Sequence, residues 1–534
     1  MATTNRSRSR QSRRTQRWLV GRALVGRRVR VAALVATAGL TLSTVSRPVS
    51  AELWRLDPGI SSQLAWTSNT QLGSAVGQED FGLEVRPRIS IRGEGARLRL
   101  DGSGSLRAVT YANGTQPNRT LPEGDFSARL EAIERLLFVE TGARALQSSE
   151  NPFGANPALT STANTVTSAQ GRLSVYMDTG PTSEYRFVAR TDNVYTKTNG
   201  AAFALTTTAA RSVFNRHSVS LEREPRPLGF RVEALRGRTR YLDDVTEPID
   251  VDLARVSLFY LLEHDLRVGI RGGAERDSFV TGDDRRRAIY GVEARWRPTE
   301  RTSIDGFVEE RIFGRGWRLA FDHRTPLVAW TALLNRDIGT TPQSLFDLPA
   351  TNNVAALLDA IFTTRFPDPA ERARQVQDFI AQQGLPSALV KPTTLVSQRL
   401  SIVNSASASL TLIGSRNSLA ISVFQARTKD ALDSGLLVTG SAITNNVDQR
   451  VGFVLSHRLT PTSSLSASLE WSRIRALDGI GSDETKQGTA RLQVSTRVAP
   501  RTSFVYGVQY RKLASNVAVS GEEAVALVGI DHGF

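Results

Sequence analysis

Apolar and polar residues alternate along most of the chain. In residues 81–92 the odd positions are apolar, whereas the even positions hold glycine, serine, glutamate or arginine. The same division recurs in residues 288–297, 491–498 and 503–511. Because successive side chains of a β-strand point to opposite faces, each segment predicts a strand with one apolar and one polar face.

The connections between these segments alternate between short and long. Short ones carry a repeated Arg-x-x-Pro sequence, and proline favours a turn over a central strand position. Long ones such as 112–125, 148–168 and 431–446 are rich in Asn, Thr, Gly and Ser, as exposed loops are. From Ile60 onward the pattern predicts about 22 strands, within a range of 16 to 22. The last seven are expected to begin near Ser397, Asn417, Val447, Ser463, Gln487, Thr502 and Glu522.

One stretch loses the alternation and predicts two helices, at 352–363 and 368–383. The second begins with Asp368-Pro369, a favourable helix start, and places apolar residues at spacings of three and four. We expect both helices to lie in a loop insertion spanning 337–396.

The fold class that follows is all-β: a transmembrane antiparallel outer-membrane β-barrel over residues 52–534, with a helical loop insertion. A soluble sheet also alternates, but a soluble sandwich of this length needs helices or a second sheet to cover its apolar face. Here the only other material is the short helical pair. A closed barrel in a bilayer pairs every backbone group and turns its apolar face to lipid.

The end of the chain supports this interpretation. Phe534 follows a strand whose alternate positions include Ile530 and Val528. This resembles the C-terminal signal strand of bacterial outer-membrane barrels, although His532 departs from the usual large apolar residue or tyrosine. The resemblance implies recognition by the barrel assembly machinery and a place among outer-membrane lipids.

The first 51 residues predict a secretory signal peptide. They hold eleven arginines and no acid, then a stretch without charge at 31–45, then a Val-x-Ala sequence that predicts cleavage after Ala51. A transmembrane anchor and a basic nucleic-acid arm are the alternatives, and the uncharged stretch is short for the ~20 residues that a spanning helix needs. Removing these eleven positive charges lowers the net charge from +15 to +4, so we expect no nucleic-acid partner.

Composition excludes several other classes. The chain of 534 residues has no cysteine, which excludes a disulfide scaffold, a thiolate metal site and a cysteine nucleophile. An apolar content of 40% and a charged content of 22% exclude bulk disorder and collagen. After Ala51 no run of ~18 apolar residues predicts a membrane-spanning helix.

Candidate catalytic chemistry is sparse, so we expect no enzyme, no metal site and no cofactor. The five histidines have no metal-ligand spacing. His217-Ser218 is the nearest approach to a base and nucleophile, but neighbours in a strand face opposite ways. Asp243-Asp244 and Asp283-Asp284 could be half of an acid–base or calcium site, although solvated loop acids are the default.

The polar strand face is rich in arginine. The candidates for lining the lumen are Arg86, Arg88, Arg92, Arg97, Arg99, Arg172, Arg186, Arg190, Arg295 and Arg297. They could guide an anionic or hydroxyl-rich polymer, or simply brace the wall through pairs with interleaved glutamates, which we weigh more heavily. Because a 22-stranded barrel leaks unless something fills it, the insertion 337–396 is the candidate constriction or gate.

Two short sequences near the predicted mature N-terminus and one later segment resemble a known family. Trp54-Arg-Leu-Asp-Pro58, the segment 65–72 and Arg190-Thr-Asp-Asn-Val-Tyr195 are similar to outer-membrane barrels associated with the PEP-CTERM/exosortase exopolysaccharide system of Gram-negative bacteria. The resemblance implies export or assembly of extracellular polysaccharide, with the polymer and periplasmic export proteins as partners. Our leading hypothesis is therefore a non-catalytic conduit for polysaccharide. The alternatives are a general or solute-specific porin and an outer-membrane hydrolase.

Overall fold

The computed structural model describes residues 53–534, with gaps. The gaps are 75, 150, 152, 156–164, 200–210, 243–246, 279–285, 341–353, 364, 384–399, 432–444 and 478–482. The predicted signal peptide 1–51 and its cleavage site Ala51 lie outside the described residues.

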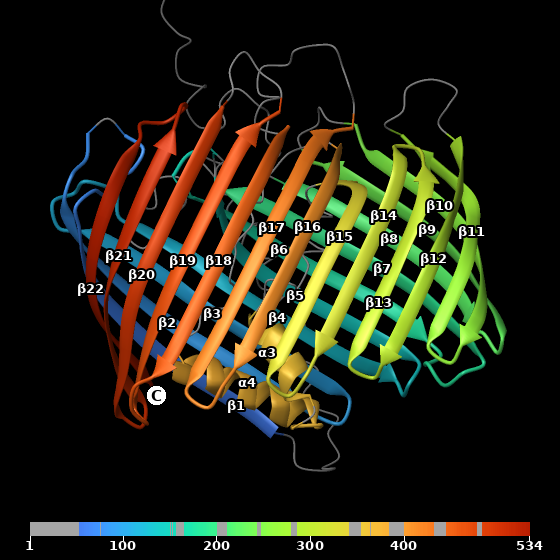
Figure 1. The fold of residues 1–534 in the computed structure, drawn as a ribbon, viewed down its shortest axis with the longest axis horizontal. Coiled ribbons are helices and arrows are strands. Elements are labelled where there is room, and N and C mark those ends of the chain that lie inside the picture. The colour runs from blue at the N-terminus through green and yellow to red at the C-terminus, as the bar shows by residue number, and fades with distance from the viewer. Residues whose placement is uncertain are drawn as a thin grey trace, which may run out of the picture. The chain divides into compact units, whose positions relative to one another are not determined.

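Strands dominate the described chain (Figure 1). In chain order they are β1 (Leu53–Thr67), β2 (Asp80–Glu94), β3 (Leu98–Tyr111), β4 (Arg119–Ile133), β5 (Leu137–Ser149), β6 (Thr165–Asp178), β7 (Tyr185–Asn199), β8 (Arg211–Arg223), β9 (Leu228–Tyr241), β10 (Ile249–Glu263), β11 (Leu266–Asp277), β12 (Arg286–Thr299), β13 (Thr302–Arg311), β14 (Gly314–Arg324), β15 (Val328–Thr340), β16 (Leu400–Ile413), β17 (Asn417–Asp430), β18 (Asn446–Arg458), β19 (Ser463–Ala476), β20 (Glu484–Ala499), β21 (Thr502–Ser515) and β22 (Gly521–Gly533).

The strands form one closed antiparallel barrel. Each strand pairs with the next, and β1 also pairs with β22, with Ala65 opposite Leu527. The 22-stranded sheet therefore has no free edge, which satisfies the backbone groups that a bilayer leaves without water. The predicted fold class is confirmed.

The alternation along each strand separates two faces of the wall. Ile270 and Val292 are opposite each other in the pairing of β11 with β12, and both are exposed on the outer face. The residues next to them in the sequence, such as Arg271 and Glu293, point into the lumen and form an ion pair with each other. The outer surface is apolar and the lumen is ionic, as expected for a barrel in lipid.

Two helices, α3 (Val354–Phe362) and α4 (Pro369–Gln383), lie between β15 and β16 in the chain. Within the described residues, no helix is long and apolar enough to cross a membrane. The predicted insertion began at Asp337, but β15 continues to Thr340 because residues 337–340 pair with β16.

The helices pack against the inner wall of the barrel. Val354, Leu357 and Leu358 of α3 form an apolar cluster with Ala420 of β17 and Val454 of β18. Ala420 and Val454 are opposite each other in the pairing of β17 with β18. Their side chains point into the lumen, close to the short turns. The helices thus lie inside the lumen near the short-turn end, where Figure 1 shows them within the ring of strands.

Candidate functional site

A network of ion pairs covers the inner wall from β8 to β15. Arg255 contacts Glu309 at 2.8 Å, and Arg271 contacts Glu309 at 3.2 Å as well as Glu293 at 3.0 Å. The network comprises Arg231, Arg255, Arg267, Arg271, Arg311, Glu222, Glu233, Glu275, Glu293, Glu309 and Asp337. Several pairs join strands two or three positions apart, such as Arg231 of β9 with Glu293 of β12, so the network ties distant strands of the wall together.

A second cluster lies around Asp192 on β7. Its buried carboxylate accepts a hydrogen bond from Ser174 Oγ at 2.6 Å, from Arg190 Nε at 2.8 Å and from Arg216 Nε at 3.2 Å. Arg190 also reaches Glu140 at 3.2 Å. Asp192 is the middle residue of the Thr-Asp-Asn sequence noted above, and here it connects β6, β7 and β8.

The structure places nine of the ten predicted lumenal arginines on the inward phase of their strands; Arg97 lies in the turn before β3. Seven have a carboxylate within 4.0 Å, including the Arg86–Glu84 contact at 3.0 Å and the Arg88–Asp531 contact at 2.7 Å. The seven are Arg86, Arg88, Arg92, Arg172, Arg186, Arg190 and Arg295. Most of these charges are therefore neutralised locally and brace the wall.

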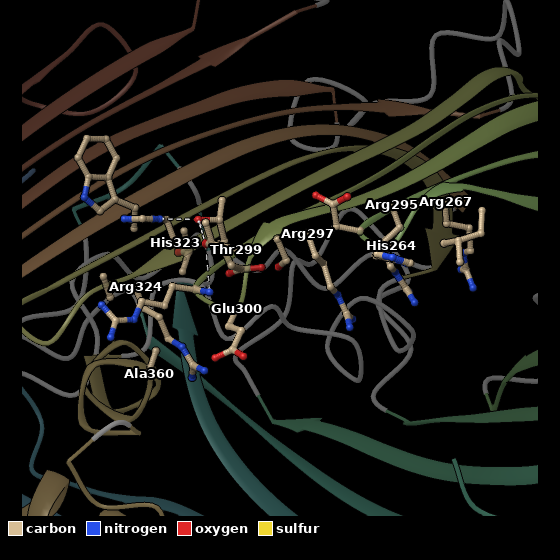
Figure 2. A pocket seen from close by; sticks show the side chains of 18 of the residues that line it. His264, Arg267, Arg295, Arg297, Thr299, Glu300, His323, Arg324 and Ala360 are labelled. Carbon is tan, nitrogen blue, oxygen red and sulfur yellow. Dashed lines mark hydrogen bonds between the residues drawn. The ribbon is translucent and has the colours of Figure 1, made fainter. Parts of the chain in front are cut away.

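The short-turn end of the lumen contains a cavity of about 990 Å³, which we call the vestibule (Figure 2). Its walls come from the turns after β8, β10 and β12 and from the facing ends of β14 and β15, and Ala360 of α3 lies at one side. Its arginines outnumber its acids by six to four. The arginines are Arg226, Arg267, Arg295, Arg297, Arg301 and Arg324, and the acids are Glu224, Asp265, Glu300 and Asp322.

The vestibule arginines differ in how far neighbouring carboxylates neutralise them. Arg267 pairs with Glu222 at 3.1 Å, and Arg295 pairs with Asp305. Among the described residues, no carboxylate lies within 4.0 Å of Arg297, Arg301 or Arg324. In Figure 2 the guanidinium of Arg297 extends away from its strand. A concave wall with an excess of fixed positive charge attracts anions.

Several arginines of the lumen were not singled out from the sequence. Arg267 and Arg271 stand on the inward phase of β11 and could have been found by extending the alternation through its glycines. Arg301 lies in a turn and Arg324 at the end of a strand. At such positions the alternation of apolar and polar residues does not predict which way a side chain points. Only the spatial arrangement of β12 to β15 brings them together.

The other candidate groups do not form a site. His217 faces outward and lies 3.1 Å from Thr191 Oγ1, whereas Ser218 faces the lumen, so the two cannot act together. Asp243-Asp244 and Asp283-Asp284 lie outside the described residues. Where the structure describes side chains, it shows no group of three or more His, Asp or Glu that could hold a metal ion.

The predicted assembly signal lies at the seam of the barrel. Val528 and Ile530 of β22 face outward, and Phe534 is 63% exposed just beyond the strand. The backbone N–H of Phe534 donates to Pro58 O at 3.0 Å, and its ring contacts His532 edge-on. Its recognition by the assembly machinery stays a prediction.

No family model and no curated protein matches the chain. Two solved receptors and an iron transporter have similar folds at low identity. The siderophore receptor PirA from Acinetobacter baumannii is 10% identical, with a TM-score of 0.43, 92% of this chain covered and 81% of that chain. A mutant of the ferric enterobactin receptor PfeA from Pseudomonas aeruginosa, in complex with enterobactin, is 9% identical (TM-score 0.46; 92% and 82% covered). The FrpB iron transporter from Neisseria meningitidis is 8% identical (TM-score 0.46; 90% and 82% covered).

At these identities the likeness extends to the fold alone. The chain is a closed 22-stranded β-barrel with an apolar outer face, the architecture predicted for a protein of the bacterial outer membrane. The resemblance to barrels of the PEP-CTERM/exosortase system is tested by none of these comparisons and stays a prediction.

The predicted role as a conduit for polysaccharide export is wrong. The similar solved structures are described as siderophore receptors and an iron transporter. The lumen itself gives the physical reason. Most of the arginines expected to guide a polymer are paired with carboxylates of the wall, and α3 and α4 occupy the lumen near the short turns.

Proposed function

We propose that the protein is a solute-specific outer-membrane channel that admits small anionic solutes. The observation that carries this proposal is the vestibule, where Arg297, Arg301 and Arg324 have no carboxylate within 4.0 Å among the described residues. An anion that reaches this end of the lumen meets guanidinium groups that are available for hydrogen bonding.

The helical pair supports selectivity over general diffusion. A barrel of 22 strands is wide, and an empty one would pass solutes with little discrimination. α3 packs on the inner wall and contributes Ala360 to the vestibule. A solute that crosses the lumen therefore passes close to both the helices and the arginines.

Ion selectivity in planar lipid bilayers tests the proposal. The purified full-length barrel is expected to pass current with a reversal potential that favours chloride under a potassium chloride gradient. The combined substitution Arg297→Gln, Arg301→Gln and Arg324→Gln is expected to move the reversal potential toward the cation side, because three fixed charges leave the vestibule.

A matched control removes three positive charges elsewhere. Arg427, Lys429 and Arg475 face outward near the long-loop end, so their replacement by glutamine leaves the vestibule intact. We expect this variant to keep the reversal potential of the wild type. A wild-type barrel that passes no current, or one that prefers cations, would contradict the proposed function.

A further inference from the structure

The outer face of β9 to β12 carries a row of charges near the long-loop end. Arg236 is opposite Asp252, Asp252 is opposite Arg276, and Arg276 is directly opposite Arg286. The carboxylate of Asp252 contacts Arg236 at 3.6 Å. Among the described residues, no carboxylate lies within 4.0 Å of Arg276 or Arg286.

Like charges placed directly opposite each other destabilise a sheet unless something of opposite charge lies between them. Arg276 and Arg286 are both exposed on the outer face, so the missing negative charge can come from outside the protein. In a barrel, long loops mark the outer surface of the membrane, so this row lies at the level of the outer lipid headgroups.

A furrow with a floor of small side chains lies one row below the arginines. Ala234, Ala254, Ala274 and Ala288 are opposite one another across four strands, all on the outer face. A groove of about 490 Å³ runs over three of these alanines and reaches Arg236, Arg276 and Arg286. The methyl side chains leave room that larger residues fill elsewhere on the wall.

A second, separate groove lies on the same outer face, between the middle of the wall and the short turns. It has a volume of about 970 Å³, and Leu258, Ile270, Val292 and Trp317 are among its outward-facing lining residues. Ile270 is six residues from Arg276 on β11. At ~3.4 Å per residue and a tilt of about 40°, this separation is roughly 16 Å along the membrane normal, about half of the ~30 Å hydrocarbon core.

We propose that this surface binds an anionic, phosphate-bearing lipid of the outer leaflet. The phosphate lies between Arg276 and Arg286, and an acyl chain follows the alanine furrow toward Ile270, at the upper end of the second groove. Charge and depth favour a lipid over a protein partner, because the basic row lies at the level of the headgroups and the alanine furrow runs from it into the outer half of the membrane. The proposal does not depend on the function of the lumen.

Titration of the detergent-solubilised full-length barrel, followed by native mass spectrometry, tests the proposal. The probe is bis-phosphorylated lipid A, compared with lipid A from which both phosphates have been removed. We expect the phosphorylated form to bind at least about tenfold more tightly, because only its phosphates can accept charge-assisted hydrogen bonds from the two guanidinium groups. Equal binding of the two forms would overturn the proposal.

Two variants and a control distinguish binding at this site from a general effect of positive charge on the barrel surface. Arg276→Gln with Arg286→Gln is expected to weaken binding of phosphorylated lipid A by about tenfold or more, for the same reason. Ala254→Leu with Ala274→Leu keeps every charge and fills the furrow, so it is also expected to weaken binding. Arg427→Gln with Lys429→Gln removes two outward charges of β17 and is expected to change nothing.

Altered mobility on unheated gels verifies that each variant is a closed barrel. If the double arginine variant does not fold, the alanine variant decides the question, because leucine on a lipid-facing strand is compatible with the barrel. Unchanged affinity of the alanine variant, or a loss in the control equal to that in the arginine variant, would refute a defined lipid site.

Discussion

Release of the helical pair from the lumen wall is the prediction that bears most directly on the channel. Leu358 of α3 is fully buried within the cluster formed by Val376 of α4, Ala420 of β17 and Val454 of β18. Replacing a buried leucine by alanine costs about 2–5 kcal/mol, depending on how far the cavity collapses. Leu358→Asp costs more, because a carboxylate would be placed among apolar groups without a partner.

The lost free energy of packing mainly weakens the attachment of the two helices to the inner wall of the barrel. The two helices are held to each other by the Arg372–Asp359 ion pair at 2.7 Å and by the edge-on contact of Phe362 with Phe379. They are therefore expected to move as a unit. A loss of about 2–5 kcal/mol changes the equilibrium between attached and released helices by about 30-fold to more than roughly 1,000-fold.

Single-channel recording in planar bilayers measures the result. We expect Leu358→Asp to add an open level of higher conductance than any level of the wild type, and Leu358→Ala to populate the same level less often. Leu358→Met conserves volume, costs less than about 1.5 kcal/mol and is the matched control with wild-type conductance. If Leu358→Asp forms a closed barrel and keeps the wild-type conductance, the helices do not constrict the lumen.

Three further predictions concern the barrel itself. Glu275→Gln removes the carboxylate that accepts two hydrogen bonds from the buried Arg311 but leaves Asp337 beside it, so it is expected to cost about 1.5–3 kcal/mol, seen as a lower temperature for loss of the folded gel mobility; no change would contradict the bracing role. Asp531→Asn breaks a half-exposed pair with Arg88, so the same assay should register less than about 1 kcal/mol. Deletion of Phe534 should reduce the amount of protein in outer-membrane fractions, whereas unchanged assembly would show that the residue is not a signal.

The alternation of the sequence predicted the barrel well because membrane strands obey a simple rule. The predicted start near Asn417 coincides with β17, and the start near Ser397 is three residues before β16. Such errors arise at strand ends, where backbone pairing can stop before or after the side-chain pattern does.

The ionic network was only partly predictable. On β11 the inward phase contains Gly269 and Gly273 between the charged residues, which obscures the polar pattern. A Cβ at Gly273 would lie 2.1 Å from Ala254 O, so the close approach of the neighbouring strand requires glycine there. The location of the vestibule was not predictable from the sequence. Its arginines are far apart in the chain and come close together only because neighbouring strands are staggered.

The barrel places charged side chains inside and apolar side chains outside. This arrangement also reverses the usual distribution of sequence variation among related proteins. In a water-soluble protein the interior resists substitution and the surface varies freely. Here an outward valine such as Val292 has only fluid lipid around it, so leucine or isoleucine should serve equally well. Glu309 contacts both Arg255 and Arg271, so a change at one of these positions requires a compensating change at another. The sequences of related chains should therefore differ most on the lipid-facing surface. In the lumen, they should show paired exchanges of acidic and basic residues.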